Sequence, residues 1–316
     1  MVDWSDTRVT VTGGAGFLGR VVCEKLRKRG CRAIDVPRSS EYDLTQEEAV
    51  ADMYRDFQPD IVLHLAAEVG GIGANRKRPG RFFYSNMAMG LHLIEHARIN
   101  NIQKFVQVGT VCAYPKFATV PFQESDIWEG YPEETNAPYG VAKKSLFVML
   151  DAYQREYGLP SALLVPVNLY GPGDNFDPAS SHVIPALIRK CVEAVEQRAD
   201  KLVCWGTGAA SREFLHVDDA AEGILRGAER IDHPTPINLG TGREIKIADL
   251  VPLIAKLTGF TGELVWDTSQ PDGQLRRCLD TQKSQELLDW QACVDLEAGL
   301  AETVEWFCQD RRAMAA

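Results

Sequence analysis

Tyr139 and Lys143 stand four residues apart in the stretch NAPYGVAKKSL. Residues at this spacing share one face of a helix, so the lysine ammonium can lie close to the phenol. We expect the ammonium to lower the phenol pKa from its ordinary value of about 10 toward that of a general acid or base. A chance Tyr/Lys pair on a helix is the alternative. The favoured interpretation is proton exchange with a substrate oxygen.

A hydroxyl and a thiol follow the apolar run KFVQV in the stretch GTVCAYPK. If the strand continues past Val108, Thr110 and Cys112 project to one face, because strand side chains alternate. Thr110 can then hydrogen-bond a substrate carbonyl, and Cys112 borders the same pocket. A free cysteine is also often a small buried hydrophobe, which leaves a structural role as the alternative.

A parallel sheet is the element that has to position these groups. Short β-branched runs alternate with helical patterns from RVTVTGG and FLGRVVCEKLRKRG to DIVLHLAA and KFVQV. This alternation predicts an α/β fold with a Rossmann-like, doubly wound parallel sheet and a smaller, interleaved C-terminal lobe. We expect residues 1-167 and 214-241 to form the sheet domain, and 168-213 and 242-316 to form the lobe. The final stretch, QDRRAMAA, has no periodic pattern and is expected to fray.

Three glycines, Gly13, Gly16 and Gly19, lie between the first predicted strand and its helix. Glycines in this context let backbone amides approach a pyrophosphate at a helix N-terminus, which predicts a bound dinucleotide. An ordinary tight turn is the alternative. Further along, Asp35 suits the ribose of NAD, whereas Arg38 suits the phosphate of NADP. We favour NADP, with NAD as the alternative.

Composition excludes several classes of partner. A net charge of -10 and a pI near 5.2 disfavour nucleic acid and anionic membranes, which require basic surfaces. No apolar run is long enough for a bilayer span, and the N-terminus lacks a signal-peptide pattern, so we expect a cytoplasmic protein. The eight cysteines are scattered, with no spacing typical of a metal site or a disulfide framework.

Longer motifs resemble one enzyme family along nearly the whole chain. AAEVGGIGAN, GTVCAYPK, NLYGPGDNFDPASSHVIPALIRK, WGTGAASREFLHVDD and PDGQLRRCLD are similar to the GDP-L-fucose synthase family of the extended short-chain dehydrogenase/reductase superfamily. The resemblance implies NADPH-dependent C3/C5 epimerisation and C4 reduction of a GDP-4-keto-6-deoxy-hexose. It implies that Thr110, Tyr139 and Lys143 form the catalytic triad. It further implies that Cys112 and His182 exchange the protons during epimerisation.

The resemblance also extends to the residues that bind the two ligands. NADP(H) is expected to contact Gly13, Gly16, Phe17, Leu18, Gly19, Arg38, Ser39, Asp43, Leu44, Leu65, Ala66, Ala67, Lys143, Pro166, Asn168, Leu169 and His182. The nucleotide sugar is expected to contact Asn168, Lys190, Trp205, Arg212 and Arg277. The family's usual Ser-Ser before the cysteine is Thr110-Val111 here, so one hydroxyl is lost.

Two other functions use the same residues. An NAD-dependent nucleotide-sugar 4-epimerase needs the same triad but no epimerising thiol. A non-catalytic NADP(H) sensor needs only the dinucleotide site. We also expect a homodimer, because Leu146, Phe147, Met149 and Leu150 give the helix after Lys143 more apolar surface than one sheet-facing stripe needs.

Overall fold

A six-stranded sheet forms the centre of the larger lobe in the computed structural model, which describes residues 2-270 and 272-315. Its strands are β1 (Arg8–Thr12), β2 (Ala33–Asp35), β3 (Ile61–His64), β4 (Lys104–Val108), β5 (Ser161–Pro166) and β9 (Pro236–Leu239). They lie in the order β2-β1-β3-β4-β5-β9, and every neighbouring pair is parallel. The predicted Rossmann-like α/β fold is confirmed.

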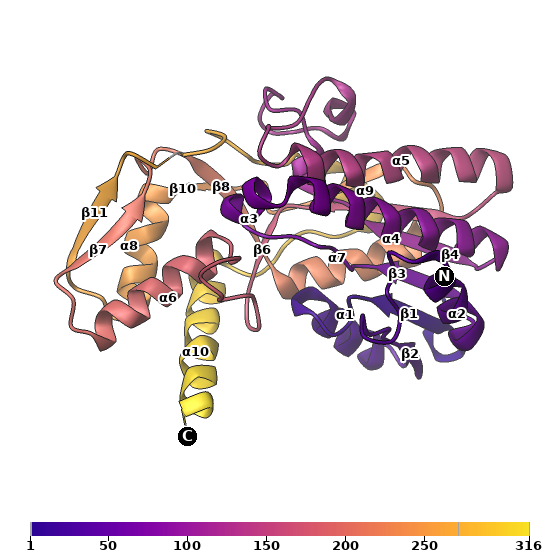
Figure 1. Cartoon of the computed structure of the whole chain (residues 1–316), viewed down its shortest axis with the longest axis horizontal. Helices are drawn as coiled ribbons and strands as arrows, with labels where there is room; N and C mark the ends of the chain where they lie inside the picture. The colour runs from indigo at the N-terminus through magenta and orange to yellow at the C-terminus, as the bar shows by residue number, and fades with distance from the viewer. Residues whose placement is uncertain (1, 271, 316) are drawn as a thin grey trace.

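Helices cover both faces of this sheet, as parallel strands require. On one face lie α1 (Phe17–Lys28) and α7 (Val217–Arg230), and the other face carries α2 (Glu47–Phe57), α4 (Pro79–Ile99) and α5 (Ala137–Tyr157). Figure 1 shows α4 and α5 running side by side above the sheet. Val22 and Leu26 are fully buried, so α1 packs an apolar face into the core of the larger lobe.

Short elements complete the larger lobe. Leu288, the last residue of α9 (Gln282–Leu288), is buried in the same core as the residues of α7 and β9. The remaining short helices are η1 (Trp4–Asp6), α3 (Ile72–Lys77), η2 (Val111–Ala113) and η3 (Glu124–Trp128). The last two follow β4 and form the surroundings of Cys112.

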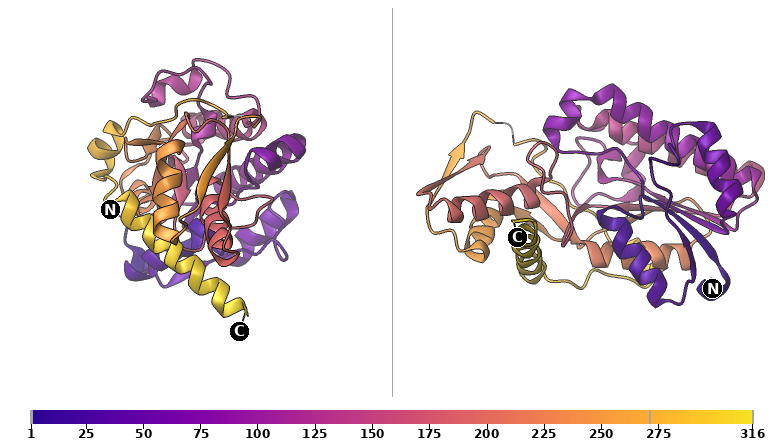
Figure 2. Two further views of the ribbon diagram at one scale, coloured as in Figure 1. Left: turned by 90° about the vertical axis from the view of Figure 1, so that its left-hand side faces the viewer. Right: turned by 60° about the horizontal axis from the view of Figure 1, so that its bottom comes forward.

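The smaller lobe has a hydrophobic core of its own, which includes Ile188, Leu250 and Leu300. Its elements are β6 (Asn168–Tyr170), α6 (Val183–Glu196), β7 (Lys201–Trp205), β8 (Ser211–His216), β10 (Glu244–Lys246), α8 (Ile247–Thr258), β11 (Glu263–Asp267) and α10 (Leu296–Ala315). They form a sheet of order β10-β8-β6 and a separate pair, β11-β7. Figure 2 shows α10 and α8 together on the outside of this lobe.

The end of the chain corrects one expectation. Helix α10 continues through Ala315, so the predicted fraying after residue 308 is wrong. The reason is tertiary, because Arg311 pairs with Glu193 and Glu196 of α6 and fixes the last turns. Within the described residues, no helix combines the length and apolar character that crossing a bilayer requires.

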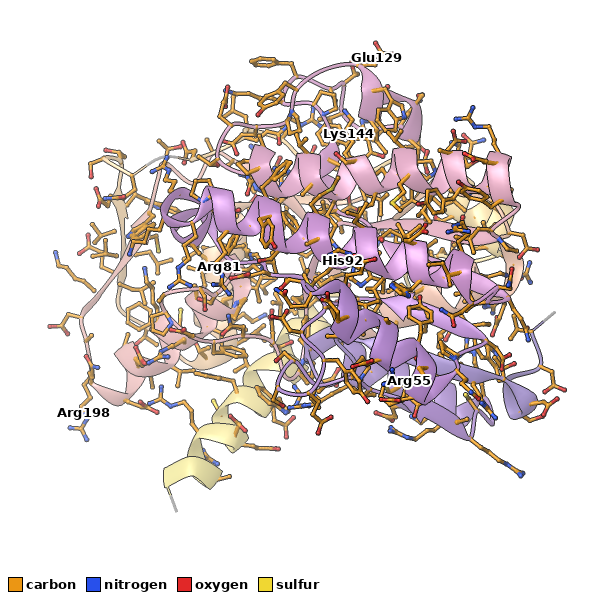
Figure 3. All side chains as sticks on the ribbon, turned by 45° about the vertical axis from the view of Figure 1, so that its right-hand side comes forward. Arg55, Arg81, His92, Glu129, Lys144 and Arg198 are labelled. Atoms are coloured by element: carbon orange, nitrogen blue, oxygen red, sulfur yellow. The ribbon has the colours of Figure 1, made fainter. Side chains whose placement is uncertain are left out.

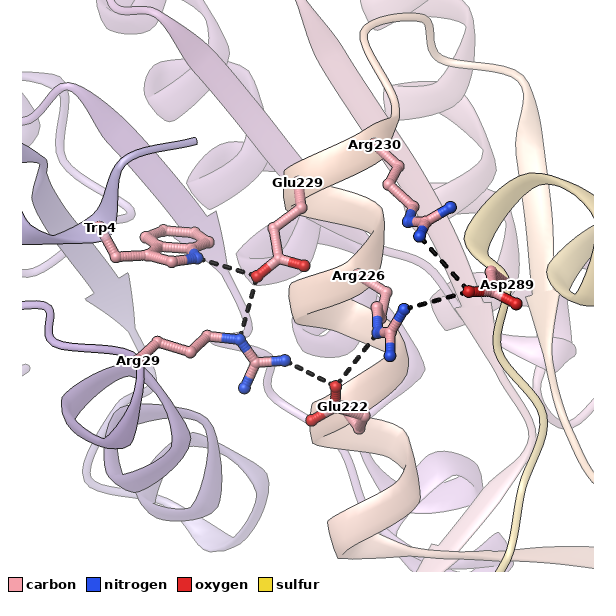
Figure 4. A network of polar contacts seen from close by, with 7 residues as sticks. All are labelled: Trp4, Arg29, Glu222, Arg226, Glu229, Arg230 and Asp289. Atoms are coloured by element: carbon pink, nitrogen blue, oxygen red, sulfur yellow. Dashed lines mark hydrogen bonds and ion pairs between the residues drawn. The ribbon is translucent and has the colours of Figure 1, made fainter. Parts of the chain in front are cut away.

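A charged network joins the two helices beneath the sheet (Figure 4). Arg29, at the end of α1, donates to Glu222 at 2.6 Å and to Glu229 at 3.0 Å, both on α7. Glu229 also accepts from the indole of Trp4, and Glu222 accepts from Arg226. Because one guanidinium serves two carboxylates, the network holds α1 in a fixed position relative to α7.

The carboxyl ends of the strands meet along one edge of the sheet. The chain passes from β1 outward to β2 and then returns to β3 on the other side of β1. Such a reversal leaves a crevice outside the carboxyl ends of the two central strands, where ligands of doubly wound sheets bind. The residues that follow β1, β2, β3, β4 and β5 therefore form the first candidate site.

Candidate active site

The turn after β1 is built for close backbone approach. Gly13 adopts a φ of +72°, and a Cβ there would lie 2.8 Å from the backbone nitrogen of Ala66. Gly16 then caps the N-terminus of α1, where unpaired amides favour an anion. The glycine turn and the loop after β3 thus meet at the crevice, as a pyrophosphate cradle requires.

The other expected cofactor contacts lie along the same edge. Arg38 and Ser39 are exposed beyond the end of β2, and Arg38 has no ion pair within the described ranges. Asp43 instead accepts two hydrogen bonds from Thr45, which lower its pKa. The start of α1, the loop after β3 and the start of β6 contribute partly exposed residues, namely Phe17, Leu18, Leu65, Ala66, Ala67, Asn168 and Leu169, whereas Gly19, Leu44 and Pro166 are buried.

Strand β2 ends at Asp35. The Asp35 carboxyl is half-buried, and burial raises its pKa. Arg38 is exposed three residues later. A free guanidinium at this rim suits the additional phosphate of NADP, so these residues fit NADP(H) better than NAD.

The residues expected to form the catalytic triad, Thr110, Tyr139 and Lys143, lie in the turn after β4 and in the first two turns of α5. Tyr139 and Lys143 are both buried on α5, and the Lys143 ammonium donates to the Val108 carbonyl at 3.3 Å. Burial raises the pKa of Tyr139, as does the nearby Cys112, whereas contact with the Thr110 hydroxyl lowers it. Thr110, Cys112 and Tyr139 therefore lie within reach of one another.

Two expectations about these residues are wrong in detail. Strand β4 stops at Val108, and Thr110 instead caps the 3-10 helix η2 by accepting the Cys112 N–H at 3.1 Å. A tight turn, and not strand alternation, therefore brings the hydroxyl and thiol to one side. Lys143 also does not lower the Tyr139 pKa, because burial dominates for both groups and lowers the pKa of Lys143 to about 8.

Helix α5 packs directly on the turn that carries Cys112. A Cβ at Gly140, next to Tyr139, would collide with the Cys112 carbonyl. Only glycine allows this approach without displacing the turn. The distance between the phenol and the thiol is thus fixed by backbone contact.

Two arginines from the smaller lobe's sequence meet at the thiol. The Arg277 guanidinium lies 3.8 Å from the Cys112 Sγ and is almost fully buried. Burial, followed by the positive charge of Arg277, lowers the pKa of Arg212 to about 10. Two close cations beside a partly exposed thiol are suited to an anionic ligand.

His182 lies at the start of α6, as its N-cap residue. The preceding loop packs against the loop after β3, where Gly71 donates to the Ser180 carbonyl at 3.1 Å. His182 is an exposed residue, yet the atoms crowded around its ring lower its pKa by desolvation. In the described part of the chain, His182 forms no hydrogen bond with Cys112.

Lys190 and Trp205 form a flat cationic surface on the smaller lobe. The Lys190 ammonium lies 5.3 Å from the centroid of the Trp205 ring, which is 66% exposed. An exposed indole beside an ammonium can stack on a ring while the charge meets a phosphate. Asn168, in contrast, donates its side-chain amide to the Glu213 carbonyl at 3.0 Å, so one of its polar groups is already used.

Sequence reasoning missed Gln274 and Glu213. Gln274 accepts from the Arg277 guanidinium at 3.0 Å and donates to the Lys116 carbonyl at 2.9 Å. Glu213 is a fully buried carboxylate in the middle of β8. An acidic residue directly before the apolar pair Phe214-Leu215 is the signal that points to it, because carboxylates are rarely buried without partners. Among the described residues, no cluster of three or more His, Cys, Asp or Glu side chains is arranged to hold a metal.

Comparison with known proteins identifies the family of the chain. Residues 9-240 match the family model described as NAD dependent epimerase/dehydratase family. GDP-L-fucose synthase of Escherichia coli (strain K12) is 39% identical, over 97% of this chain and 98% of that protein.

Two solved structures share the fold. A GDP-6-OMe-4-keto-L-xylo-heptose reductase from C. jejuni has a TM-score of 0.91 at 28% identity, over 97% of this chain and 99% of that one. A GDP-L-fucose synthetase from Naegleria fowleri bound to NADP has a TM-score of 0.89 at 29% identity, over 98% and 94%. The chain therefore belongs to the NAD dependent epimerase/dehydratase family and, within it, to the GDP-L-fucose synthases that its motifs resemble.

Proposed function

We propose that the protein is an NADPH-dependent epimerase/reductase that inverts C3 and C5 of a GDP-4-keto-6-deoxy-hexose and then reduces C4. The observation that carries the proposal is the grouping of Cys112, Tyr139 and Thr110 with Arg277 at the dinucleotide edge of the sheet. The names of the relatives support the GDP-sugar. The glycine turn and the free Arg38 support NADP(H), which supplies the hydride for C4 when bound.

Epimerisation is assigned to the thiol and the imidazole. A ketone at C4 acidifies the protons on C3 and C5, and inversion requires removal from one face of the ring and return on the other. Burial lowers the pKa of His182, so its neutral form is available as a base at neutral pH. Cys112 is partly exposed beside the triad, where its Sγ can exchange a proton with the opposite face.

Reduction is assigned to the triad. Thr110 hydrogen-bonds the C4 oxygen, and Tyr139 gives it a proton. The raised pKa of Tyr139 keeps its phenol protonated at neutral pH, as a proton donor requires. Lys143 lies one helical turn further along α5, on the same face. In this proposal the larger lobe binds NADP(H), and residues 168-213 and 242-316 contribute the contacts to the nucleotide sugar.

A labelling experiment in D2O tests this assignment. The wild-type protein is incubated with the 4-keto sugar nucleotide and NADPH, and the product is examined for deuterium at C3 and C5. Cys112→Ser is expected to abolish incorporation, while reduction of an already epimerised ketone continues. A 4-epimerase would keep full turnover in Cys112→Ser, and a non-catalytic sensor would consume no NADPH. Either result would overturn the proposal.

We also propose a homodimer, through a different surface from the one expected. Leu146, Phe147 and Leu150 are buried within the monomer and cannot form an interface. The outward surface of α4 and α5 instead exposes Phe83, Tyr84, Leu91, Val148 and Tyr157. Figure 3 shows these two helices side by side at the surface, with His92 and Lys144 on them. Sedimentation of wild type against Leu91→Arg tests the pairing, and a wild-type monomer at micromolar concentration would exclude it.

The remaining expectations form part of the same proposal. The net charge of -10 supports a protein without a nucleic-acid partner. A cytoplasmic location is proposed as well. Fractionation of the native cell with an antibody tests the location.

A further inference from the structure

Glu213 is a buried carboxylate that joins three segments of the chain. It is 0% exposed in β8. One oxygen accepts from the Gly242 N–H at 2.7 Å and from the N–H and hydroxyl of Thr241, and the other accepts from the Leu279 N–H at 2.7 Å. An isolated buried carboxylate is very costly, but these four bonds occupy both of its oxygens. An apolar side chain at this position could not accept these hydrogen bonds, so the arrangement is specific for a carboxylate.

Each side of this junction leads to an arginine of the candidate site. Arg212 directly precedes Glu213 in β8, and Arg277 lies two residues before Leu279. The two guanidinium groups are close enough for the charge of Arg277 to lower the Arg212 pKa. Two positively charged guanidinium groups this close together repel each other. Contacts with other parts of the chain are therefore needed to keep both side chains beside Cys112.

Other hydrogen bonds hold residues 274-280 from the side opposite Glu213. Phe122 donates to the Cys278 carbonyl at 2.8 Å and accepts from the Asp280 N–H at 2.9 Å. Gln274 bridges Arg277 to the Lys116 carbonyl. Residues 274-280 therefore run between the Cys112 loop and Glu213. On the side of the smaller lobe Glu213 holds them together with the Ser211 N–H, which donates to the Leu275 carbonyl at 2.9 Å, and with the ion pair between Arg276 and Glu244.

We infer that Glu213 is a positioning residue, which holds Arg212 and Arg277 together at Cys112 so that a diphosphate-linked sugar is placed against the thiol. The inference rests on the proposed function, because it takes the two arginines as the diphosphate contacts. Glu213 itself does not touch the substrate. Among the described residues Glu213 forms no hydrogen bond with either guanidinium, because its oxygens accept from Thr241, Gly242 and Leu279.

The test uses the full chain with Glu213→Gln. The side-chain NH2 of glutamine would face backbone N–H donors, so the junction loses at least one bond. A displacement of about 1 Å in an active site can lower catalytic efficiency about 100-fold. We therefore expect displaced arginines to raise the Kd for GDP and the KM for the 4-keto sugar nucleotide by roughly 10- to 100-fold. The Kd for NADPH is expected to stay unchanged. Unchanged GDP binding would overturn the inference.

Asp219→Asn is the matched control. Asp219 is also buried, and its carboxylate accepts the backbone N–H groups of Cys293 and Val294, at 3.0 and 2.9 Å. Asp219 anchors residues 293 and 294, which are far in sequence from both Arg212 and Arg277. If Asp219→Asn raises the Kd for GDP as much as Glu213→Gln does, the effect is general softening of the fold, and the inference fails.

A double-mutant cycle separates this inference from the proposed function. If Glu213 acts through Arg277, then Glu213→Gln adds little to the Kd for GDP in an Arg277→Ala background. Full additivity would overturn the inference. If Arg277→Ala alone changes neither GDP binding nor the KM, the substrate assignment itself fails. Should Glu213→Gln not fold, Glu213→Asp, which keeps the charge but shortens the side chain, is expected to show the same selective loss of GDP binding.

Discussion

Replacing Lys143 by methionine should make the protein more stable while it abolishes turnover. The Lys143 side chain is 2% exposed, and within the described residues its ammonium has one hydrogen bond, the 3.3 Å contact with the Val108 carbonyl. Burial lowers its pKa from 10.5 to about 8. A charge held in this environment costs folding free energy, which methionine of similar length does not.

The magnitude follows from proton linkage. The folded chain binds fewer protons at Lys143 than the unfolded chain between pH 8 and 10.5, so stability rises with pH across that window. A difference of about 2.5 pKa units corresponds to about 3 kcal/mol at pH 7 and to less than about 1 kcal/mol at pH 10. Lys143→Met should therefore raise the free energy of unfolding by up to about 3 kcal/mol at pH 7, with a gain that shrinks as the pH rises.

Urea unfolding of nucleotide-free protein at pH 7 and pH 10 measures this gain. Bound cofactor has to be removed, because it stabilises the folded state by mass action. Lys104→Met is the matched control. Lys104 is also buried, but its ammonium donates to the Ala228 carbonyl at 2.7 Å and pairs with Asp232 at 2.6 Å. Its loss should lower the free energy of unfolding by about 1 to 3 kcal/mol.

Two results would refute this reasoning. One is a Lys143→Met variant that loses stability at pH 7 as Lys104→Met does. The other is a gain in stability that is equally large at pH 10, since a pH-independent gain would come from packing and not from the buried charge.

Three further outcomes are expected. Arg38→Ala should raise the Kd for NADPH by roughly 10- to 100-fold, because one charge-assisted contact with the phosphate is lost, and should leave the Kd for NADH unchanged. Fluorescence titration measures both Kd values, and Arg32→Ala is the control. Trp205→Ala should raise the KM for the nucleotide sugar by about tenfold without lowering Tm, because the ring is 66% exposed; an unchanged KM would remove Trp205 from the site. Arg29→Met should cost about 1 kcal/mol of stability at low salt and less in 1 M salt. Arg55→Met should cost almost no stability, because the Arg55 side chain in its pair with Asp52 is 68% exposed. Equal losses of stability in Arg29→Met and Arg55→Met would count against the network.

Local sequence determined the sheet and the cofactor edge. β-branched runs of four to six residues separated by amphipathic helices can bury their apolar faces only as a covered parallel sheet, and β1, β3, β4 and β5 lie where those runs stand. The glycine turn between β1 and α1 was equally readable, because glycine is the residue that tolerates the positive φ of Gly13. The helix pairing of Tyr139 and Lys143 follows from spacing alone.

Tertiary structure decided the chemistry of the pocket. The periodicity of KFVQV could not show that β4 ends at Val108 and that a 3-10 turn presents Cys112. Spacing could not show that burial overrides the influence of Lys143 on Tyr139, since desolvation depends on every element packed around them. Arg277 reaches Cys112 from 165 residues away because a carboxylate in β8 holds its segment. Local patterns specify local conformation, whereas desolvation and long-range hydrogen bonds exist only once distant segments are packed together.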